Sequence, residues 1–244
     1  MKKFLFLFAV LGACGGAEDP AATEEPIQGG KRDPNDPAVG LVWFEGGGFC
    51  SGALIAPNVV MTAGHCVGDP VAGFYTGTGS QATDVGALPI GKLTKHAVSA
   101  QLAHPSYSSR GGCPNSTFDV GLLRLAKPIT GVKPLGFAAQ PPKKNATCSA
   151  VGYGMHDDGT QTTVEQKRRA TETVEAIDAT SVLVKYKSGI VDHGDSGGPL
   201  LCGGKIAGAT SCGTDGSGAD HVEAYYARTD TIRDWIAATV DGWR

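Results

Sequence analysis

The chain has 244 residues, enough for one large domain or two small ones, each with a hydrophobic core. Hydrophobic residues make up 41% of it, which excludes a disordered protein. The formal net charge of −3 offers no basic surface of the kind that a nucleic-acid partner requires. We therefore expect a globular protein with no nucleic-acid partner.

The N-terminal residues predict a targeting segment. Lys2 and Lys3 precede the apolar run 4–11, which is too short to anchor the chain across a bilayer. The next residues, LGAC, resemble a bacterial lipobox, whose cysteine, here Cys14, is lipidated and becomes the mature N-terminus. The alternative is an ordinary cleavage site with a cysteine nearby. We expect residues 1–13 to be a signal peptide and the protein to be an exported bacterial one, either a periplasmic or outer-membrane lipoprotein or a secreted protein.

Residues 14–26 form an acidic stretch with little to bury. It carries Glu18, Asp19, Glu24 and Glu25 and no basic residue. Such a composition is typical of a solvated tether or propeptide, or of a plain disordered leader. Membrane contact is expected only through a lipid at Cys14.

The remaining chain predicts mostly β-structure. Short apolar runs are bounded by Gly, Pro and Asn turns, as in an all-β barrel or sandwich, at 40–44, 51–55, 120–125 and 181–187. A helix is predicted only near the end, over Thr229–Thr239, with Thr229 or Asp230 as its cap. Its apolar face would hold Ile232, Trp235, Ile236 and Thr239. Pro134, Pro141 and Pro142 mark an internal linker, so we expect two β-rich halves, 27–132 and 133–244.

Seven cysteines indicate an oxidising compartment. With Cys14 set aside, the even set of Cys50, Cys66, Cys113, Cys148, Cys202 and Cys212 suits three disulfides. None shows the Cys-x-x-Cys spacing of a metal or redox site. We expect no metal and no cofactor.

The stretch VDHGDSGGPLLCGG, residues 191–204, places Ser196 between glycines. Taken alone it also fits the G-x-S-x-G elbow of other hydrolases, but that elbow needs a βαβ setting and a histidine placed after the serine. Only His221 follows Ser196. Upstream, VVMTAGHC carries His65 and FDVGLLRL carries Asp119. The chain order is therefore His, Asp, Ser.

These stretches together resemble the chymotrypsin/trypsin family of serine peptidases. The matching segments are CSGALIAPNVVMTAGHC, DVGLLRL, CSAVGYG, GDSGGPLLC and YYARTDTIRDWI, and the resemblance runs from Ile27 to Arg244. It implies two antiparallel β-barrels with a C-terminal helix. His65 and Asp119 would come from the first barrel and Ser196 from the second, with the cleft between them.

The resemblance assigns a chemical role to each residue. Ser196 would attack the scissile carbonyl while His65 takes its proton, since histidine titrates near neutral pH. Asp119 would orient His65 and stabilise its cation. The backbone N–H groups of Gly194 and Ser196 would stabilise the oxyanion.

Ser211 resembles the serine that hydrogen-bonds the catalytic carboxylate. The strand that it begins, through Gly213, would pair with an extended substrate backbone. Protein or peptide substrates are therefore expected.

Activation is expected to depend on Ile27 and Asp195. In the family, a new N-terminal amine neutralises the carboxylate before the nucleophile, and Ile27-Gln28-Gly29-Gly30 resembles that N-terminus. Pro26 departs from the usual Arg or Lys, so the activating protease is unknown. The alternative is an uncleaved chain of weak activity.

The primary specificity pocket is expected to have Ile190 as its floor. Ala224 and Gly213 would line its walls, with His193 nearby. An apolar floor disfavours a charged side chain, which would lose its solvation there, so an uncharged apolar residue is expected before the scissile bond. Asp192 stands where many relatives have a cysteine, and Ile190 is alternatively a core residue.

The resemblance also implies the disulfide pairing. Cys50–Cys66 and Cys148–Cys202 match family positions, which leaves Cys113 and Cys212 to pair or to remain free thiols. We expect a monomeric serine endopeptidase made as a zymogen. The alternatives are a catalytically weak or silent family member acting as a binding protein, and an esterase.

Overall fold

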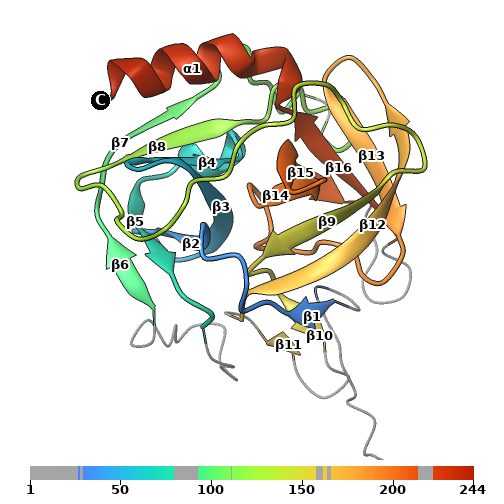
Figure 1. The fold of residues 1–244 in the computed structure, drawn as a ribbon, viewed down its shortest axis with the longest axis horizontal. Helices are drawn as coiled ribbons and strands as arrows, with labels where there is room; N and C mark the ends of the chain where they lie inside the picture. The colour runs from blue at the N-terminus through green and yellow to red at the C-terminus, as the bar shows by residue number, and fades with distance from the viewer. Residues whose placement is uncertain are drawn as a thin grey trace, which may run out of the picture.

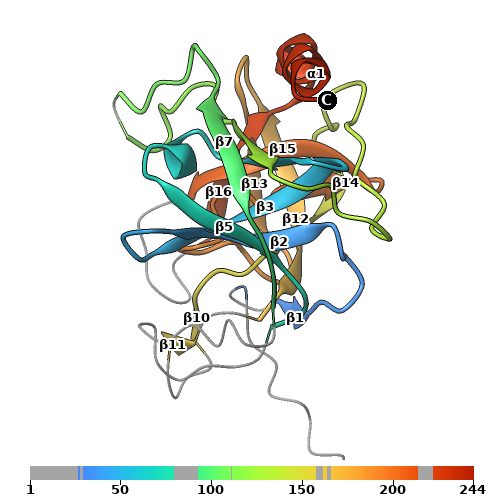
Figure 2. The same ribbon diagram turned by 90° about the vertical axis from the view of Figure 1, so that its left-hand side faces the viewer.

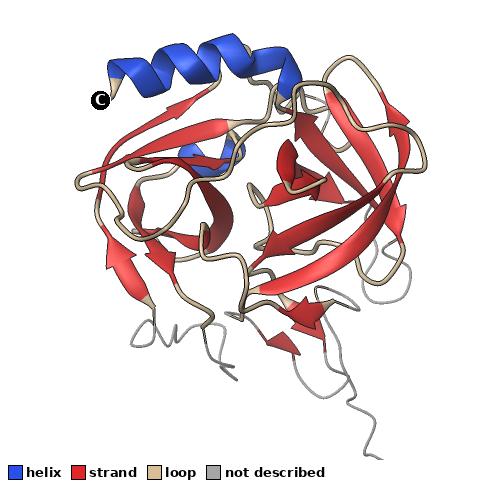
Figure 3. Ribbon diagram, in the orientation of Figure 1, coloured by secondary structure: helices blue, strands red, loops and turns tan. Residues whose placement is uncertain are grey.

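The computed structural model describes residues 27, 30–79, 93–110, 112–157, 162–163, 166–213 and 222–244. These residues form two seven-stranded antiparallel sheets, a small two-stranded sheet and a C-terminal helix (Figure 1, Figure 3). The all-β prediction is confirmed. The expected signal peptide, acidic tether and Cys14 lie outside the described residues. No helix in the described part of the chain has the length and apolar character that a membrane crossing requires.

The first barrel is a sheet with the strand order β6-β5-β2-β3-β4-β8-β7. Its strands are β2 Val39–Phe44, β3 Phe49–Ala56, β4 Val59–Thr62, β5 Val71–Thr76, β6 Thr94–His96, β7 Val98–Ala103 and β8 Gly121–Leu125. The sheet curls so that β5 meets β7, where the Val71 N–H donates to Gln101 Oε1 at 3.0 Å. Aliphatic residues on the inner face, together with Phe74, fill the barrel.

The second barrel has the strand order β1-β12-β13-β16-β15-β14-β9. Its strands are β1 Lys31–Arg32, β9 Thr147–Gly152, β12 Arg168–Ile177, β13 Ser181–Tyr186, β14 Pro199–Cys202, β15 Lys205–Gly213 and β16 Glu223–Arg228. Because β9 also pairs with β12, the sheet closes on itself. The short strands β10 His156–Asp157 and β11 Thr162–Thr163 form a separate hairpin.

The segment from Ile27 to β1 and the C-terminal helix each pack on the barrel that is formed mainly by the other half of the sequence. Strand β1 pairs with β12, and Ile27 is buried in the core of the second barrel. At the other end, helix α1, Arg233–Gly242, follows the second barrel but packs on the first (Figure 1, Figure 2). Asn58 Nδ2 of the first barrel donates to the Trp243 carbonyl at 3.0 Å.

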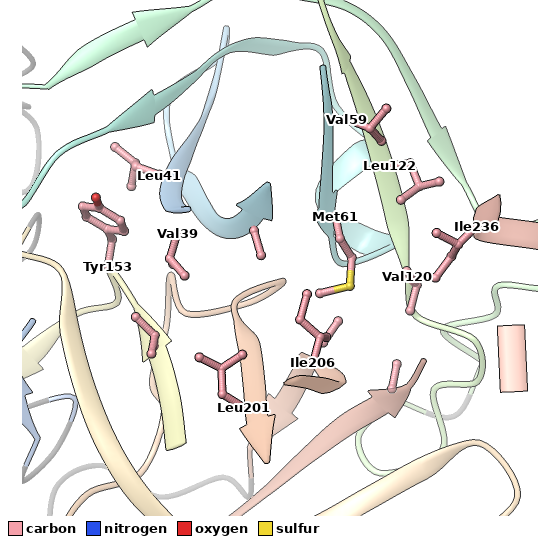
Figure 4. Packing of buried hydrophobic residues seen from close by; sticks show 14 of the residues in the cluster. Val39, Leu41, Val59, Met61, Val120, Leu122, Tyr153, Leu201, Ile206 and Ile236 are labelled. Carbon is pink, nitrogen blue, oxygen red and sulfur yellow. The ribbon is translucent and has the colours of Figure 1, made fainter. Parts of the chain in front are cut away.

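A third hydrophobic cluster joins the two barrels. Figure 4 shows Met61 of the first barrel against Ile206 of the second, and Leu122 of the first barrel near Ile236 of α1. All four side chains are at most 4% exposed. This cluster also contains Val120, the residue after Asp119.

The C-terminal helix differs from its prediction at both ends. A 3₁₀ turn covers Asp230–Ile232, and the α-helix then runs to Gly242. Neither Thr229 nor Asp230 caps it, because no side chain bonds the first-turn amides. The Thr229 hydroxyl instead donates to the Ile206 carbonyl at 3.3 Å. The expected apolar face is correct for Ile232 and Ile236, both buried.

Candidate active site

His65 and Asp119 are brought together by two hydrogen bonds. Nδ1 of His65 lies 2.8 Å from Asp119 Oδ2, and the backbone N–H of His65 donates to Oδ1 at 2.9 Å. The His65 side chain is 36% exposed and that of Asp119 only 2%. The His65 imidazole is thus accessible to solvent, while the Asp119 carboxylate that holds it is buried.

Local structure fixes both residues. His65 begins the 3₁₀ turn His65–Val67 that follows β4, and the disulfide Cys50–Cys66 ties this turn to β3. Asp119 precedes β8, where the next residue, Val120, is fully buried. Burial of Val120 leaves the chain little freedom to turn Asp119 away from His65.

Asp119 also accepts a hydrogen bond from Ser211 Oγ at 2.7 Å. Burial would raise the pKa of Asp119, but the hydrogen bonds from His65 and Ser211 outweigh it and lower the pKa below its ordinary value. Asp119 therefore stays ionised at neutral pH, as a carboxylate that orients an imidazole must.

Ser196 is half-buried and lies in a tight loop before β14. Its carbonyl accepts the Ser51 N–H at 2.8 Å and lies 3.7 Å from Cys66 Sγ, so the first barrel holds the loop. No hydrogen bond joins the Ser196 hydroxyl to His65 within the described residues. The structure thus links His65 to Asp119 directly, and both to Ser196 only through the surrounding backbone.

The glycines beside Ser196 are required by the backbone and by crowding. Gly194 has φ +94° and Gly197 has φ +80°, a region that L side chains rarely adopt. A Cβ on Gly194 would lie 2.1 Å from the Phe49 ring, and one on Gly197 would lie 2.2 Å from Thr62 Oγ1. The loop can therefore form only with glycine at both positions.

The backbone N–H groups of Gly194 and Ser196 are available for a ligand. Among the described residues, neither donates to a protein acceptor, whereas the Asp195 N–H between them donates to the Asp192 carbonyl at 2.9 Å. Gly194 and Ser196 are half-buried rather than covered. Two free donors on either side of one residue can bind a single oxyanion.

Asp195 is completely buried behind this loop. Its Oδ1 accepts the Gly154 N–H at 2.7 Å and its Oδ2 accepts the Asp192 N–H at 2.9 Å. Burial raises the pKa of Asp195 to about 7, with smaller lowering contributions from these two amides and from the charge of Arg168. Among the described residues, no cation forms an ion pair with it. The side chain of Ile27 is 1% exposed and packs with Ile190 and Val191.

The residues expected to form the specificity pocket differ in how deeply they are buried. Ile190 and Ala224 are fully buried in the second-barrel core, which favours the core interpretation of Ile190. Gly213 is half-buried and pairs with Ala224. The His193 side chain is 87% exposed, with Nδ1 2.8 Å from Asp192 Oδ1, so it lies in solvent. The segment 214–221 lies outside the described residues.

Three disulfides stabilise the site, with the pairs that the resemblance implied. They are Cys50–Cys66, Cys148–Cys202 and Cys113–Cys212. The last joins the loop before Asp119 to β15 beside Ser211, with a Cα–Cα distance of 5.9 Å. Cys50, His65 and Cys66 have possible metal-binding atoms within 4.8 Å of one another, but both sulfurs are committed to the disulfide.

Comparison with known proteins identifies the family. A family profile described as Trypsin matches residues 27–236. The chain belongs to the trypsin family. Among its relatives, Kallikrein 1-related peptidase b22 of Mus musculus is 30% identical over 262 residues, which cover 98% of both chains. Kallikrein-4 of Homo sapiens is 24% identical over 248 residues, which cover 96% of this chain and 94% of the relative.

Solved structures have the same fold as this chain. Human heparin binding protein matches with a TM-score of 0.68 and 22% identity, over 87% of this chain and 96% of that protein. Neuropsin from mouse brain matches with a TM-score of 0.68 and 24% identity, over 86% of this chain and 98% of that protein. The expected fold of two antiparallel barrels with a C-terminal helix is confirmed.

As a trypsin-family protein, the chain is a serine-type endopeptidase that acts on proteins or peptides. Its disulfides indicate an exported protein. These relatives are mammalian, so a bacterial lipoprotein stays a prediction.

Two residues of the site were missed by sequence reasoning. The hydroxyl of Ser51 bonds the nucleophile loop, and the Gly154 amide bonds Asp195. Ser51 carried one signal, since it is a polar residue in a strand otherwise made of small and apolar ones. Gly154 gave no signal of its own, because glycines are frequent in this chain.

Proposed function

We propose that the protein cleaves peptide bonds through an acyl-enzyme on Ser196. His65 takes the hydroxyl proton as Ser196 Oγ bonds to the scissile carbonyl carbon, then delivers that proton to the departing amine. Water attacks the resulting ester in the same way and releases the acid. The observation that supports this best is the Asp119 carboxylate, bonded at once to the His65 ring, the His65 amide and the Ser211 hydroxyl.

The oxyanion of each tetrahedral intermediate would bind the N–H groups of Gly194 and Ser196. Both are without protein acceptors in the described residues, and they lie on either side of Asp195, the second of them on the residue that carries the attacking oxygen. Donors fixed before the reaction need no reorganisation as charge develops, and each contributes about 3 kcal/mol in such sites.

The experiment that tests the mechanism compares wild type with Ser196→Ala. We expect Ser196→Ala to lose turnover of a defined peptide and labelling by a fluorophosphonate probe, with an unchanged circular dichroism spectrum. Turnover at the wild-type rate in a folded Ser196→Ala protein would reject the assignment. A wild type that labels but cleaves only small esters would indicate an esterase, and one that does neither would indicate a silent binding protein.

We further propose that the chain is a zymogen whose active form begins at Ile27. The buried Asp195 has no described cation partner, and the Ile27 side chain already packs within the second barrel. A released Ile27 amine would supply the missing positive charge. N-terminal sequencing of active enzyme decides this, and residues still attached before Ile27 would contradict it.

For the primary pocket we propose a preference for an uncharged apolar residue before the scissile bond. Ile190 and Ala224 contribute no charge to the core behind it. A lysine or arginine side chain would lose its solvation there without gaining a partner. Cleavage-site profiling with a peptide library tests this, and a majority of cuts after basic residues would refute it.

For export we propose a lipoprotein precursor attached through Cys14. Cleavage before Ile27 would then both activate the enzyme and release it from its lipid anchor. The lipobox resemblance and the acidic stretch 14–26 support this proposal.

A further inference from the structure

Ser51 uses every polar group that it has to hold the nucleophile loop and its surroundings. It lies on β3 and is 0% exposed. Its N–H donates to the Ser196 carbonyl at 2.8 Å, and its own carbonyl accepts the Thr62 hydroxyl at 2.8 Å. Its hydroxyl donates to the Gly194 carbonyl at 2.9 Å and accepts the Tyr153 N–H at 2.9 Å.

The hydroxyl belongs to a larger set of bonds centred on residues 153–155. Three consecutive amides there bind three different acceptors. The Tyr153 N–H donates to Ser51 Oγ, the Gly154 N–H to Asp195 Oδ1 and the Met155 N–H to the His193 carbonyl at 2.6 Å. Ser51 is the member of this set that connects the first barrel to it.

These bonds fix two successive peptide planes. A peptide unit is planar and trans, so its C=O and the following N–H point in opposite directions. The His193 carbonyl points at Met155, and the Gly194 N–H in the same plane therefore points the other way. The next plane is held at its carbonyl by Ser51 and at its N–H by the Asp192 carbonyl.

We propose that Ser51 is a positioning residue for catalysis: its hydroxyl holds the Gly194–Asp195 peptide plane, which lies between the two planes that carry the Gly194 and Ser196 N–H groups, and so keeps both donors aimed at the oxyanion. The inference rests on the proposed function, since it concerns the oxyanion-binding donors of that reaction. Gly194 is the residue most in need of such a hold, because its φ of +94° lies in a region that glycine leaves easily. Among the described residues, Ser51 is the single donor to its carbonyl.

The expected kinetic effect follows from the geometry. Loss of a whole oxyanion donor costs about 10²–10³-fold in kcat. Ser51→Ala keeps both donors but releases the carbonyl end of the peptide plane between them, so we expect kcat to fall by roughly 10 to 100-fold. KM should change less than about threefold, because the ground-state carbonyl relies little on this donor.

The experiment measures mature wild type, Ser51→Ala, Ser51→Thr and the control Ser181→Ala on one peptide substrate. Ser181 is also buried and its hydroxyl also donates to a side chain, Asp178, but it lies on β13 away from the loop. Ser51→Thr retains the hydroxyl and should recover most of the lost kcat. Binding of a peptide aldehyde, which forms a tetrahedral adduct, should weaken in Ser51→Ala by the same factor as kcat/KM. A folded Ser51→Ala with kcat within twofold of wild type overturns the proposal, as does an equal loss in Ser181→Ala.

Two further measurements decide the question without relying on that variant's activity. Amide hydrogen exchange should quicken at Tyr153 and Asp195 in Ser51→Ala and stay unchanged in Ser181→Ala; unchanged exchange in both overturns the proposal, even if wild type proves inert toward peptides and the proposed function fails. Should Ser51→Ala not fold, the crystal structure of fluorophosphonate-treated wild type replaces it. The Ser51–Gly194 bond should persist there with the Gly194 N–H on the phosphoryl oxygen, and a Gly194 carbonyl turned away from Ser51 overturns the proposal.

Discussion

The proposed precursor, which keeps the residues before Ile27, should lose stability as the pH rises, because Asp195 is buried and no cation among the described residues forms an ion pair with it. Burial raises the pKa of Asp195 from 3.8 to about 7. The folded precursor then binds a proton more tightly than the unfolded chain, so its stability from this group is full below about pH 4 and is lost as the pH rises through 7. A shift of this size corresponds to roughly 4 kcal/mol in the free energy of unfolding.

The assay is urea unfolding of the Ser196→Ala precursor, which keeps the residues before Ile27, at a series of pH values from 4 to 8. Asp195→Asn should remove most of this group's contribution, since an amide does not titrate. Glu172 is the matched comparison, because burial likewise raises its pKa, to about 8. Glu172→Gln should therefore leave the Asp195 contribution in place while flattening the curve near pH 8.

Processing should change this curve. When the chain begins at Ile27, the new amine can pair with the Asp195 carboxylate, and the loss of stability between pH 4 and 7 should shrink. Activity of the processed enzyme should then fall at high pH as the amine deprotonates. A precursor whose stability is flat or rises from pH 4 to 8, with Asp195→Asn no different, would refute the reasoning.

Four other outcomes are expected. Asp119→Asn should lower kcat by about 10⁴-fold with little change in KM, as measured by steady-state kinetics, because the His65 tautomer is no longer fixed. Ser211→Ala should lower kcat by about tenfold and leave thermal unfolding within a few degrees, because Asp119 loses one of its hydrogen bonds. Replacing Cys113 and Cys212 together with alanine should cost about 2–5 kcal/mol in denaturant unfolding. Cys14→Ser should abolish membrane fractionation and any acyl mass, and unchanged fractionation would argue for simple secretion.

The sequence places His65, Asp119 and Ser196 in short motifs, which report local geometry, and their catalytic roles stay a prediction. The turns beside Ser196 require glycine, since Gly194 and Gly197 have positive φ, and such turns can be recognised from the sequence. The structure places the imidazole on the carboxylate as those stretches implied. The strand segments near 40–44 and 120–125 were also predicted to within a residue or two.

Contacts between distant segments were not predictable in the same way. The Ser51 hydroxyl bonds a carbonyl 143 residues away, and the periodicity of β3 says nothing of what lies opposite it. Glu172 is completely buried against the Tyr226 hydroxyl at 2.6 Å, although a strand glutamate ordinarily faces solvent. The cap predicted at Thr229 is wrong, because the Thr229 hydroxyl donates to the Ile206 carbonyl instead of accepting from the helix.

Strand β1 and helix α1 each contact the barrel that the other half of the sequence forms. Strand β1, which precedes the first barrel in the sequence, pairs with β12 of the second, and α1, which follows the second barrel, packs on the first. If a protease cut the linker near Pro141, β1 of the N-terminal fragment would still pair with the second barrel, and α1 of the C-terminal fragment would still pack on the first. Each fragment would then supply a segment that packs on the barrel of the other, so a nicked molecule should stay associated under native conditions.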